Sequence, residues 1–520
     1  MNNSKAENTI GKRFYQILLL ILICVVLFLR IVPYLKMAVT WDELGTLYEV
    51  GYSYSFLWEY ILIGKHPPLY FFVMKFLTEF FTTTHMLLKI PSTLASFALI
   101  YAFYLFTRDK LGTYVGYVIT FLFSISLPIF LFGFEGRPYL FIILFSFLSV
   151  IYYQKIFDVM LVEKRELTRL ECLKLFVIGF TCLYTSYLSG LFFICNTINW
   201  GFYIIWQQLI SGHQWFFHKF VKTICVIAIS YLPWFLLTYY KISQQLYEYP
   251  SGFFNYLYIF QSFFNHSWGM SVSFVISFFF TIYSLFKNQT AESLKFKLIF
   301  VTYFIFVFII IVRSLMFSSL ISLRYLAILT PFLYLIFGYT LKEIFQNRKE
   351  VLLSLFLFLP LMYLSPVSEI GKGYYQTYFI DFPKIFNRME TLSSEKIKLK
   401  SIEKTLLIAF FGNHHFLEYP IENHTFVSKM PLFQLHQKPW YYYGGFCNKL
   451  KGDRQRLLDQ ISQDDIKGIW LIFPDGECDD GVNLRSELSK LAKSVYREND
   501  ISSDVGIEYW EVESNKQIMP

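Results

Sequence analysis

Long hydrophobic runs separated by short polar stretches occupy the first 366 residues. Runs of about 18–23 apolar residues recur, and each could cross the hydrocarbon core of a bilayer as an α-helix. The pattern predicts eleven membrane helices, at residues 14–36, 86–106, 113–133, 139–157, 173–190, 191–210, 219–240, 270–287, 296–313, 323–341 and 350–366. The first run is too long for a signal peptide, so we expect an uncleaved helix there. This part of the chain is predicted to be an all-α polytopic membrane domain.

Residues 67–84 follow a different pattern. Their polar residues share one helical face, and phenylalanines fill much of the rest. The polar residues concerned are Lys75, Thr78, Glu79 and Thr82. The pattern predicts an amphipathic helix lying in the membrane interface, with Pro67 and Pro68 in its first turn. A short spanning helix is the alternative.

Basic residues alternate between loops, and this sets the expected topology. Cytoplasmic loops of membrane proteins are enriched in Lys and Arg. The basic loops contain Arg108 and Lys110; Lys155 to Lys174; Lys219 and Lys222; Lys287 to Lys297; and Lys342 to Lys349. We therefore predict a multi-pass plasma (inner) membrane protein with a cytoplasmic N-terminus. Loop 37–85, the turn 134–138 and the C-terminal part would lie on the extracytoplasmic side.

Residues 367–520 are more polar and are predicted to form a small extracytoplasmic α/β domain. Apolar or alternating runs predict strands at 405–411, 469–473 and 506–512, and the spacing in 484–496 predicts a helix. The expected domains are thus 1–366 and 367–520. Cys447 and Cys478 could form a disulfide in this domain or remain as free thiols, and the sequence favours neither possibility.

Composition narrows the possible functions. The chain has 520 residues, of which 55% are hydrophobic, 21% aromatic and only 16% charged, which is too apolar for a soluble globular protein. The net charge of +8 comes mostly from the short basic loops and does not indicate nucleic-acid binding. No Gly-rich phosphate loop is present, so no nucleotide is expected.

Several ionisable residues fall on the predicted extracytoplasmic face. They are Asp42, Glu43, Lys65, His66, Lys89, Glu135, Arg137 and Arg324. Carboxylates of this kind can accept a hydroxyl proton, and the cations can hold a phosphate. Simpler interpretations remain open: the acids could cap a helix, the arginines could anchor the chain at the interface, and His66 could be a turn residue.

These residues belong to motifs in a particular order. Asp42-Glu43 comes first. It is followed by His-Pro-Pro-Leu-Tyr (66–70), Lys-Ile-Pro-Ser (89–92), Glu-Gly-Arg-Pro-Tyr (135–139) and Arg-Tyr-Leu (324–326). Pro331 follows the last motif. The order resembles the GT-C class of integral-membrane glycosyltransferases over about residues 14–340. It is most similar to the superfamily of protein O-mannosyltransferases and lipid A aminoarabinose transferases. Gly136 and Lys89 stand where that superfamily usually has Ala and Arg.

The resemblance implies a sugar donor carried on polyprenyl phosphate and an extracytoplasmic acceptor that is a glycolipid, a cell-surface polysaccharide or a protein. Asp42 would be the general base, and Glu43 would orient the acceptor or tune Asp42. Arg137 and Arg324 would bind the donor phosphate, with Lys65, His66 and Lys89 as secondary candidates. Glu135, Tyr139 and Tyr325 would support them. Attack opposite the phosphate would invert the anomeric centre.

Two questions stay open at this stage. No cofactor is expected to be required, but Asp42, Glu43 and Glu135 could bind Mg²⁺ or Mn²⁺ through their oxygens. The competing functions are a transporter or flippase of lipid-linked sugars and a non-catalytic subunit of a polysaccharide assembly complex. A transporter predicts broken helices with charges near the bilayer midplane, whereas these charges gather at one face.

Overall fold

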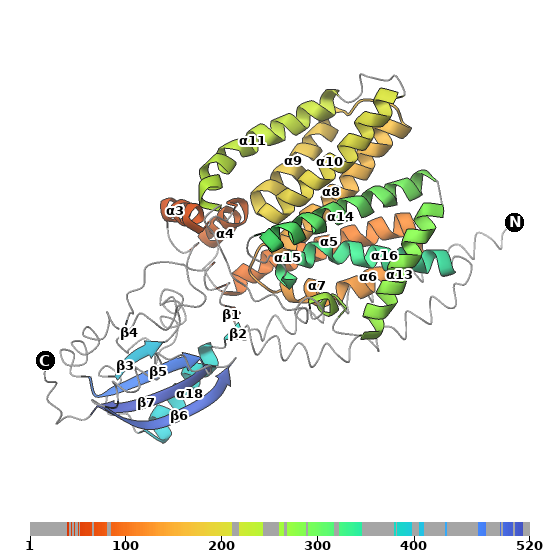
Figure 1. Ribbon diagram of the computed structural model, residues 1–520. Coiled ribbons are helices and arrows are strands. Elements are labelled where there is room, and N and C mark those ends of the chain that lie inside the picture. The colour runs from red at the N-terminus through yellow and green to blue at the C-terminus, as the bar shows by residue number, and fades with distance from the viewer. Residues whose placement is uncertain are drawn as a thin grey trace, which may run out of the picture. The chain divides into compact units, whose positions relative to one another are not determined.

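The computed structural model divides the chain into two compact units (Figure 1). Unit 1 comprises residues 1–36 and 49–370, and unit 2 comprises residues 37–48 and 371–520. The structure describes residues 39–40, 43, 46, 50, 53–64, 67–80, 85–210, 218–242, 259–264, 268–287, 290–316, 322–345, 379–380, 382–397, 405–409, 432–433, 466–474, 489, 492–502 and 505–512. The helices predicted at 14–36 and 350–366 and the predicted domain boundary lie outside these residues.

Unit 1 is a bundle of apolar helices that run back and forth (Figure 1). The helices of the bundle are α5 (His85–Leu111), α6 (Thr113–Ser124), α7 (Leu127–Phe132), α8 (Tyr139–Phe157), α9 (Arg169–Thr185), α10 (Tyr187–Ile210), α11 (His218–Ile242), α13 (Trp268–Lys287), α14 (Ala291–Met316), α15 (Leu323–Leu326) and α16 (Thr330–Phe345). A π-helical turn, η1 (Asp158–Val162), extends α8, and a 3₁₀ turn, η2 (Ala327–Leu329), joins α15 to α16. Within the described residues, seven helical segments are long and apolar enough to cross a membrane. The predicted helical membrane part is confirmed.

Local sequence explains where these helices begin and end. Gly112 has φ +90°, a conformation that favours glycine, and it separates α5 from α6. The predicted helix 113–133 is interrupted after Ser124, and Pro128 lies in the first turn of α7, where its missing N–H costs little. The predicted break between residues 190 and 191 is displaced, because the extended backbone of Ser186 ends α9. These two predictions were wrong in their bounds.

Two short helices precede the bundle. Helix α4 (Leu69–Phe80) confirms the helix predicted within residues 67–84. Its 12 described residues span about 18 Å, less than the hydrocarbon core of a bilayer. Whether this segment lies in the interface or spans the membrane stays a prediction. Lys75 and Glu79, two of the residues predicted to share its polar face, form an ion pair with their charged atoms 3.9 Å apart. Helix α3 (Tyr54–Gly64) was not predicted.

Charged side chains connect the helix ends that carry the basic loops. Lys342, near the end of α16, donates to the carbonyl oxygen of Lys110, near the end of α5 (2.9 Å). Lys110 pairs with Glu292 at the start of α14 (3.3 Å). Lys295 in turn pairs with Glu292 (2.9 Å) and with Asp158 at the end of α8 (2.5 Å). We call this end of unit 1 the basic end.

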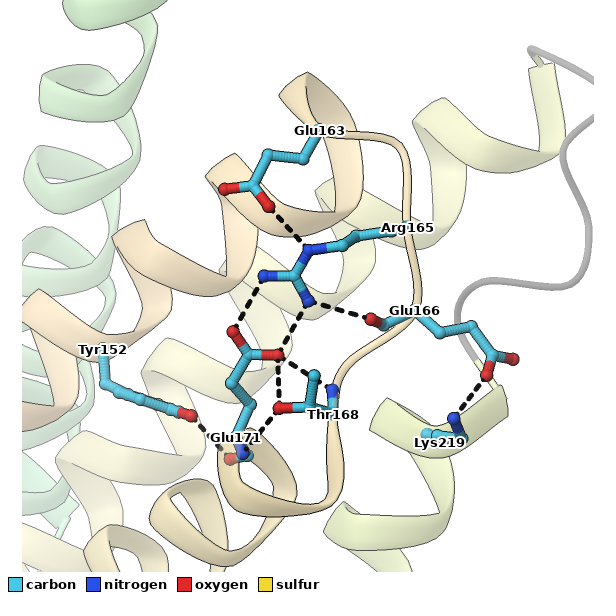
Figure 2. Close-up of polar contacts among 7 residues, drawn as sticks. All are labelled: Tyr152, Glu163, Arg165, Glu166, Thr168, Glu171 and Lys219. Carbon is cyan, nitrogen blue, oxygen red and sulfur yellow. Dashed lines mark hydrogen bonds and ion pairs between the residues drawn. The ribbon is translucent and has the colours of Figure 1, made fainter.

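Figure 2 shows a second group of contacts, in the loop between α8 and α9. Arg165 donates to both carboxylate oxygens of Glu171 (2.9 and 3.0 Å) and to Glu163 (2.6 Å). Glu166 pairs with Lys219 at the start of α11 (2.7 Å). The loops that the charge pattern assigns to one side therefore lie at one end of the unit. Which side of a membrane that end faces stays a prediction.

Consecutive long helices of unit 1 run in opposite directions, so α5, α8, α10, α13 and α15 begin at the end opposite the basic end. We call this the motif end, because three of the sequence motifs fall there. Stacked aromatic rings hold the bundle together between the two ends. Phe103 of α5 stacks on Phe123 of α6 (4.1 Å between ring centroids), and Tyr303 of α14 stacks on Phe332 of α16 (4.4 Å).

Unit 2 contains a five-stranded mixed sheet with the strand order β4-β3-β5-β7-β6. The strands are β3 (Thr405–Ala409), β4 (Leu432–Phe433), β5 (Gly468–Pro474), β6 (Ala492–Ser502) and β7 (Val505–Val512). Strands β3, β4 and β5 pair in parallel, and β7 pairs antiparallel with β5 and β6. Helix α18 (Phe382–Glu395) contacts β6 and buries Ile385, Met389 and Leu392 completely. The three predicted strands are confirmed.

One prediction for unit 2 is wrong. The helix predicted over residues 484–496 does not reach Ala492–Tyr496, which belong to β6. The reason is tertiary: these residues pair with β7 through a register that contains a bulge, and this pairing outweighs the local helical spacing. Cys447 and Cys478 lie outside the described residues.

Candidate active site

Two sequence motifs meet at the motif end of unit 1. The fully buried hydroxyl of Ser92, in the first turns of α5, donates to the carbonyl oxygen of Arg137 (3.1 Å). The next hydroxyl, that of Thr93, donates to the carbonyl oxygen of Gly133 (2.9 Å). These bonds tie the Lys-Ile-Pro-Ser segment to both sides of the turn that carries Glu135 and Arg137. The structure thus brings together motifs that lie more than 40 residues apart.

The turn between α7 and α8 is compact and held from within. Phe134 is fully buried and makes an edge-on contact with Phe130 of α7 (5.2 Å). The N–H of Arg137 donates to the carbonyl oxygen of Glu135 (2.7 Å), and both side chains are half-buried. Pro138 then caps α8. Arg137 therefore lies immediately before the N-terminus of a 19-residue helix, where the positive end of the helix dipole favours an anion.

Lys89 and Tyr139 flank this turn. Lys89 is only 1% exposed, which is unusual for lysine because its ammonium loses hydration when buried. The Thr93 hydroxyl, which donates to Gly133, also lies 3.0 Å from the Lys89 carbonyl oxygen, so the two carbonyls share its proton. The ring of Tyr139, in the first turn of α8, packs against Phe132 (5.0 Å). Both predicted site residues thus have fixed positions at the motif end.

Arg324 and Tyr325 lie in α15, the short helix that opens the last segment of the bundle, and both are half-buried. The N–H groups of Tyr325 and Leu326 both donate to the carbonyl oxygen of Ser322 (3.2 and 3.0 Å). The following turn, η2, is buried and contacts α8. Arg324 therefore belongs to a segment that is anchored on the same helix that Arg137 precedes.

The His-Pro-Pro-Leu-Tyr motif opens α4. Pro67, Pro68 and Tyr70 are buried, and the Tyr70 ring lies 5.8 Å from that of Phe141, near the start of α8. Phe141 is four residues beyond Arg137, so this motif also reaches the turn that carries Arg137. Lys65 and His66 lie outside the described residues.

The acidic motif belongs to unit 2. Just before it, β1 (Val39–Thr40) pairs antiparallel with β2 (Phe379–Ile380). The side chain of Glu43 is completely buried, so Glu43 is not a solvated surface acid. Asp42 lies outside the described residues. In the described part of the chain, no three His, Cys, Asp or Glu side chains are grouped so as to hold a metal ion.

The structure also shows features of the motif end that the sequence analysis missed. The Ser92 and Thr93 hydroxyls link two motifs, although only Ser92 belongs to a quoted motif. Helix α3 carries Tyr54, whose hydroxyl donates to Glu79 of α4 (2.9 Å), and Trp58, whose ring lies 5.9 Å from Phe72 of α4. The spacing of Tyr54 and Trp58, one helical turn apart, was the signal available for α3.

Comparison with known proteins identifies the fold. No protein-family model matches the sequence, and no curated protein sequence matches it. Among solved structures, ArnT from Cupriavidus metallidurans bound to undecaprenyl phosphate superimposes with a TM-score of 0.56 at 10% identity, covering 94% of this chain and 97% of ArnT. The apo form of the same protein superimposes with a TM-score of 0.55 at 12% identity and covers the same shares of the two chains.

An archaeal enzyme shows the same architecture. The apo oligosaccharyltransferase of Archaeoglobus fulgidus superimposes with a TM-score of 0.51 at 10% identity, covering 98% of this chain and 75% of that one. ArnT and the oligosaccharyltransferase are both GT-C glycosyltransferases. The chain is therefore an integral membrane protein with the GT-C fold, and the predicted fold class is confirmed.

Proposed function

We propose that the protein is a glycosyltransferase that moves a sugar from a polyprenyl-phosphate donor to an extracytoplasmic acceptor. The observation that carries this proposal is the contact between two cationic motifs at the motif end, where the Ser92 hydroxyl binds the Arg137 carbonyl (3.1 Å). The GT-C fold supports it, and a protein of this fold has been crystallised with undecaprenyl phosphate.

The donor phosphate would lie at the start of α8. Arg137 would offer two parallel N–H groups to the phosphate oxygens, a geometry that lysine cannot provide. The positive end of the α8 helix dipole would add to the attraction. Arg324, from the segment anchored on α8, and the buried Lys89 would supply further positive charge, with Lys65 and His66 as secondary partners. Glu135, Tyr139 and Tyr325 would hold these groups in place.

Asp42 would serve as the general base. The acceptor oxygen attacks the anomeric carbon, its proton passes to the Asp42 carboxylate, and the bond from the anomeric carbon to the phosphate oxygen breaks. Polyprenyl phosphate leaves with the electron pair, and its developing charge is stabilised by the arginines. Glu43, the next residue in the sequence, has a buried side chain and would orient the acceptor or tune Asp42. Attack opposite the phosphate inverts the anomeric centre.

A transfer assay with the full-length protein in lipid nanodiscs tests the proposal. A radiolabelled polyprenyl-phosphate sugar is supplied with glycolipid, polysaccharide or protein acceptors, and transferred label is counted with and without a chelator. Arg137→Lys keeps the charge but loses the paired geometry, so transfer should fall about tenfold or more. Arg108→Lys, an exposed residue at the basic end, is the matched control.

The assay separates the competing functions. Label that crosses the membrane while still attached to its carrier would indicate a flippase, and no change in the donor would indicate a non-catalytic subunit. Either result overturns the proposal. Loss of transfer with the chelator, restored by Mg²⁺ or Mn²⁺, would show that transfer requires a divalent cation.

A further inference from the structure

A group of aromatic side chains lies where α9 ends, α10 begins and α11 approaches its end. We call Tyr184, Tyr187, Tyr231, Trp234 and Trp58 the aromatic cluster. The rings of Tyr184 and Tyr231 lie edge-on at 5.5 Å, and those of Trp58 and Trp234 at 6.0 Å. Tyr187 lies close to both Tyr231 and Trp234. The cluster thus joins three bundle helices to α3 at the motif end.

Three polar atoms in and beside this cluster are buried without a hydrogen-bond partner in the described structure. They are the indole N–H of Trp234 and the hydroxyls of Tyr187 and Thr185. Trp234 is 2% exposed and Thr185 is 4% exposed. The Tyr187 hydroxyl faces Trp234 and Thr238 but meets neither with hydrogen-bond geometry. Buried polar groups are nearly always paired, so these three groups can offer hydrogen bonds to a bound molecule.

An interfacial belt of aromatic residues does not explain this cluster. Belt Trp and Tyr side chains face lipid and direct their polar tips to the headgroups. The indole of Trp234 is buried against Trp58 instead. Trp206, in the same bundle, is 52% exposed and stacks only on Phe202, as a lipid-facing residue does.

The cluster is connected to the proposed phosphate site. Trp58 packs on Phe72 of α4 (5.9 Å), and Tyr70, two residues earlier in α4, packs on Phe141 of α8 (5.8 Å). Helix α4 therefore contacts the aromatic cluster through one residue and the start of α8, next to Arg137, through another.

We propose that the aromatic cluster binds a pyranose ring, with Trp58 as the apolar platform and Trp234, Tyr187 and Thr185 as hydrogen-bonding groups. A pyranose combines the two features required: its C–H face packs on an indole, and its hydroxyl and ring oxygens accept hydrogen bonds. This inference rests on the proposed function, because the ring would be the sugar of the donor or of the acceptor.

Binding is tested first without any transfer. Saturation-transfer NMR on the full-length protein in nanodiscs uses methyl glycosides of glucose, galactose, mannose and N-acetylglucosamine as probes. At least one probe should give a signal that Trp234→Phe and Tyr187→Phe each weaken about fivefold, the effect of one hydrogen bond. Trp206→Phe should leave the signal unchanged. The inference is overturned if no probe gives a signal, or if neither Trp234→Phe nor Tyr187→Phe alters it.

Kinetics then distinguish the source of the sugar. If the cluster binds the acceptor, Tyr187→Phe should raise the KM for the acceptor about fivefold. If the cluster binds the donor sugar, the KM for the donor should rise by the same factor. In both cases kcat should stay nearly unchanged. A probe signal that depends on Tyr187 in a protein that transfers no sugar would support the sugar site and contradict the proposed enzyme. Transfer with unaltered KM values for both substrates would contradict the sugar site alone.

Discussion

The guanidinium of Arg165 holds the carboxylate of Glu171 with two parallel hydrogen bonds of 2.9 and 3.0 Å (Figure 2). The same carboxylate accepts from the N–H and the hydroxyl of Thr168, which closes a capping box at the start of α9. One acidic side chain therefore fixes both the loop after α8 and the first turn of α9. This arrangement links the loop after α8 to the start of α9 at the basic end.

Replacing Arg165 should destabilise unit 1. Arg165→Gln leaves Glu171, which is largely buried, without its cationic partner and should lower the free energy of unfolding by about 2 kcal/mol. The midpoint of thermal unfolding in nanodiscs measures the effect. Arg169→Gln, an exposed residue in the same loop region, is the control and should change the midpoint little. Equal midpoints for the two variants would contradict the role of Arg165.

Acid should weaken the same contact. The hydrogen bonds from Arg165 lower the pKa of Glu171 from 4.5 to about 2. Because the folded-state pKa lies below the unfolded one, this stabilisation is fully present above about pH 4.5 and is lost as the pH falls towards 2. The stability difference between the wild type and Glu171→Gln should therefore be constant above pH 5 and shrink below it. A difference that does not change between pH 5 and pH 3 would show that Glu171 is not tuned in this way.

Close approach of α5 and α6 depends on Gly116. A Cβ atom at this position would lie 2.8 Å from the backbone nitrogen of Arg108, which cannot move without displacing α5. Gly116→Ala should therefore destabilise the bundle by about 1–3 kcal/mol. Gly201→Ala is the control, since a Cβ there would meet only the Phe220 ring, at 3.3 Å. Thermal unfolding of both variants checks this, and a stable Gly116→Ala protein would show that the two helices can separate without cost.

Ser92 should influence the proposed donor site through Arg137. Ser92→Ala removes the hydrogen bond to the Arg137 carbonyl and should raise KM for the donor about fivefold to tenfold. Ser149→Ala, which removes an equally buried hydroxyl that binds Asn196 (2.7 Å), should lower stability without raising that KM. If both variants raised the KM for the donor equally, the cause would be reduced stability of the bundle, and the proposed positioning of Arg137 by Ser92 would be contradicted.

Periodicity and charge were sufficient to predict most of unit 1. Each described membrane helix contains a long apolar run, and the basic loops lie together at one end as the charge pattern predicts. Interruptions were harder to place, because Ser186 ends α9 through its backbone conformation and not through a breaking residue type. In unit 2, the helical spacing around residue 492 was misleading, because pairing with β7 makes that segment a strand.

The candidate site was only partly predictable. The order of motifs identified Lys89, Arg137 and Arg324, since charged residues between apolar runs are conspicuous in a sequence. Hydroxyls and indoles that lie within apolar runs gave no such signal, so the contacts of Thr93 and Trp234 became visible only in three dimensions. The roles of all the predicted site residues stay predictions, and Asp42, Lys65 and His66 also lie outside the described residues.

The most direct test of the central claim is the rate of label transfer from a polyprenyl-phosphate sugar by the wild type and by Asp42→Asn. The substitution keeps the shape of the side chain but removes the base, so the rate should fall by about 10²–10⁴-fold while thermal unfolding is unchanged. A wild-type protein that transfers no sugar, or a folded Asp42→Asn variant that transfers it at the full rate, would contradict the account.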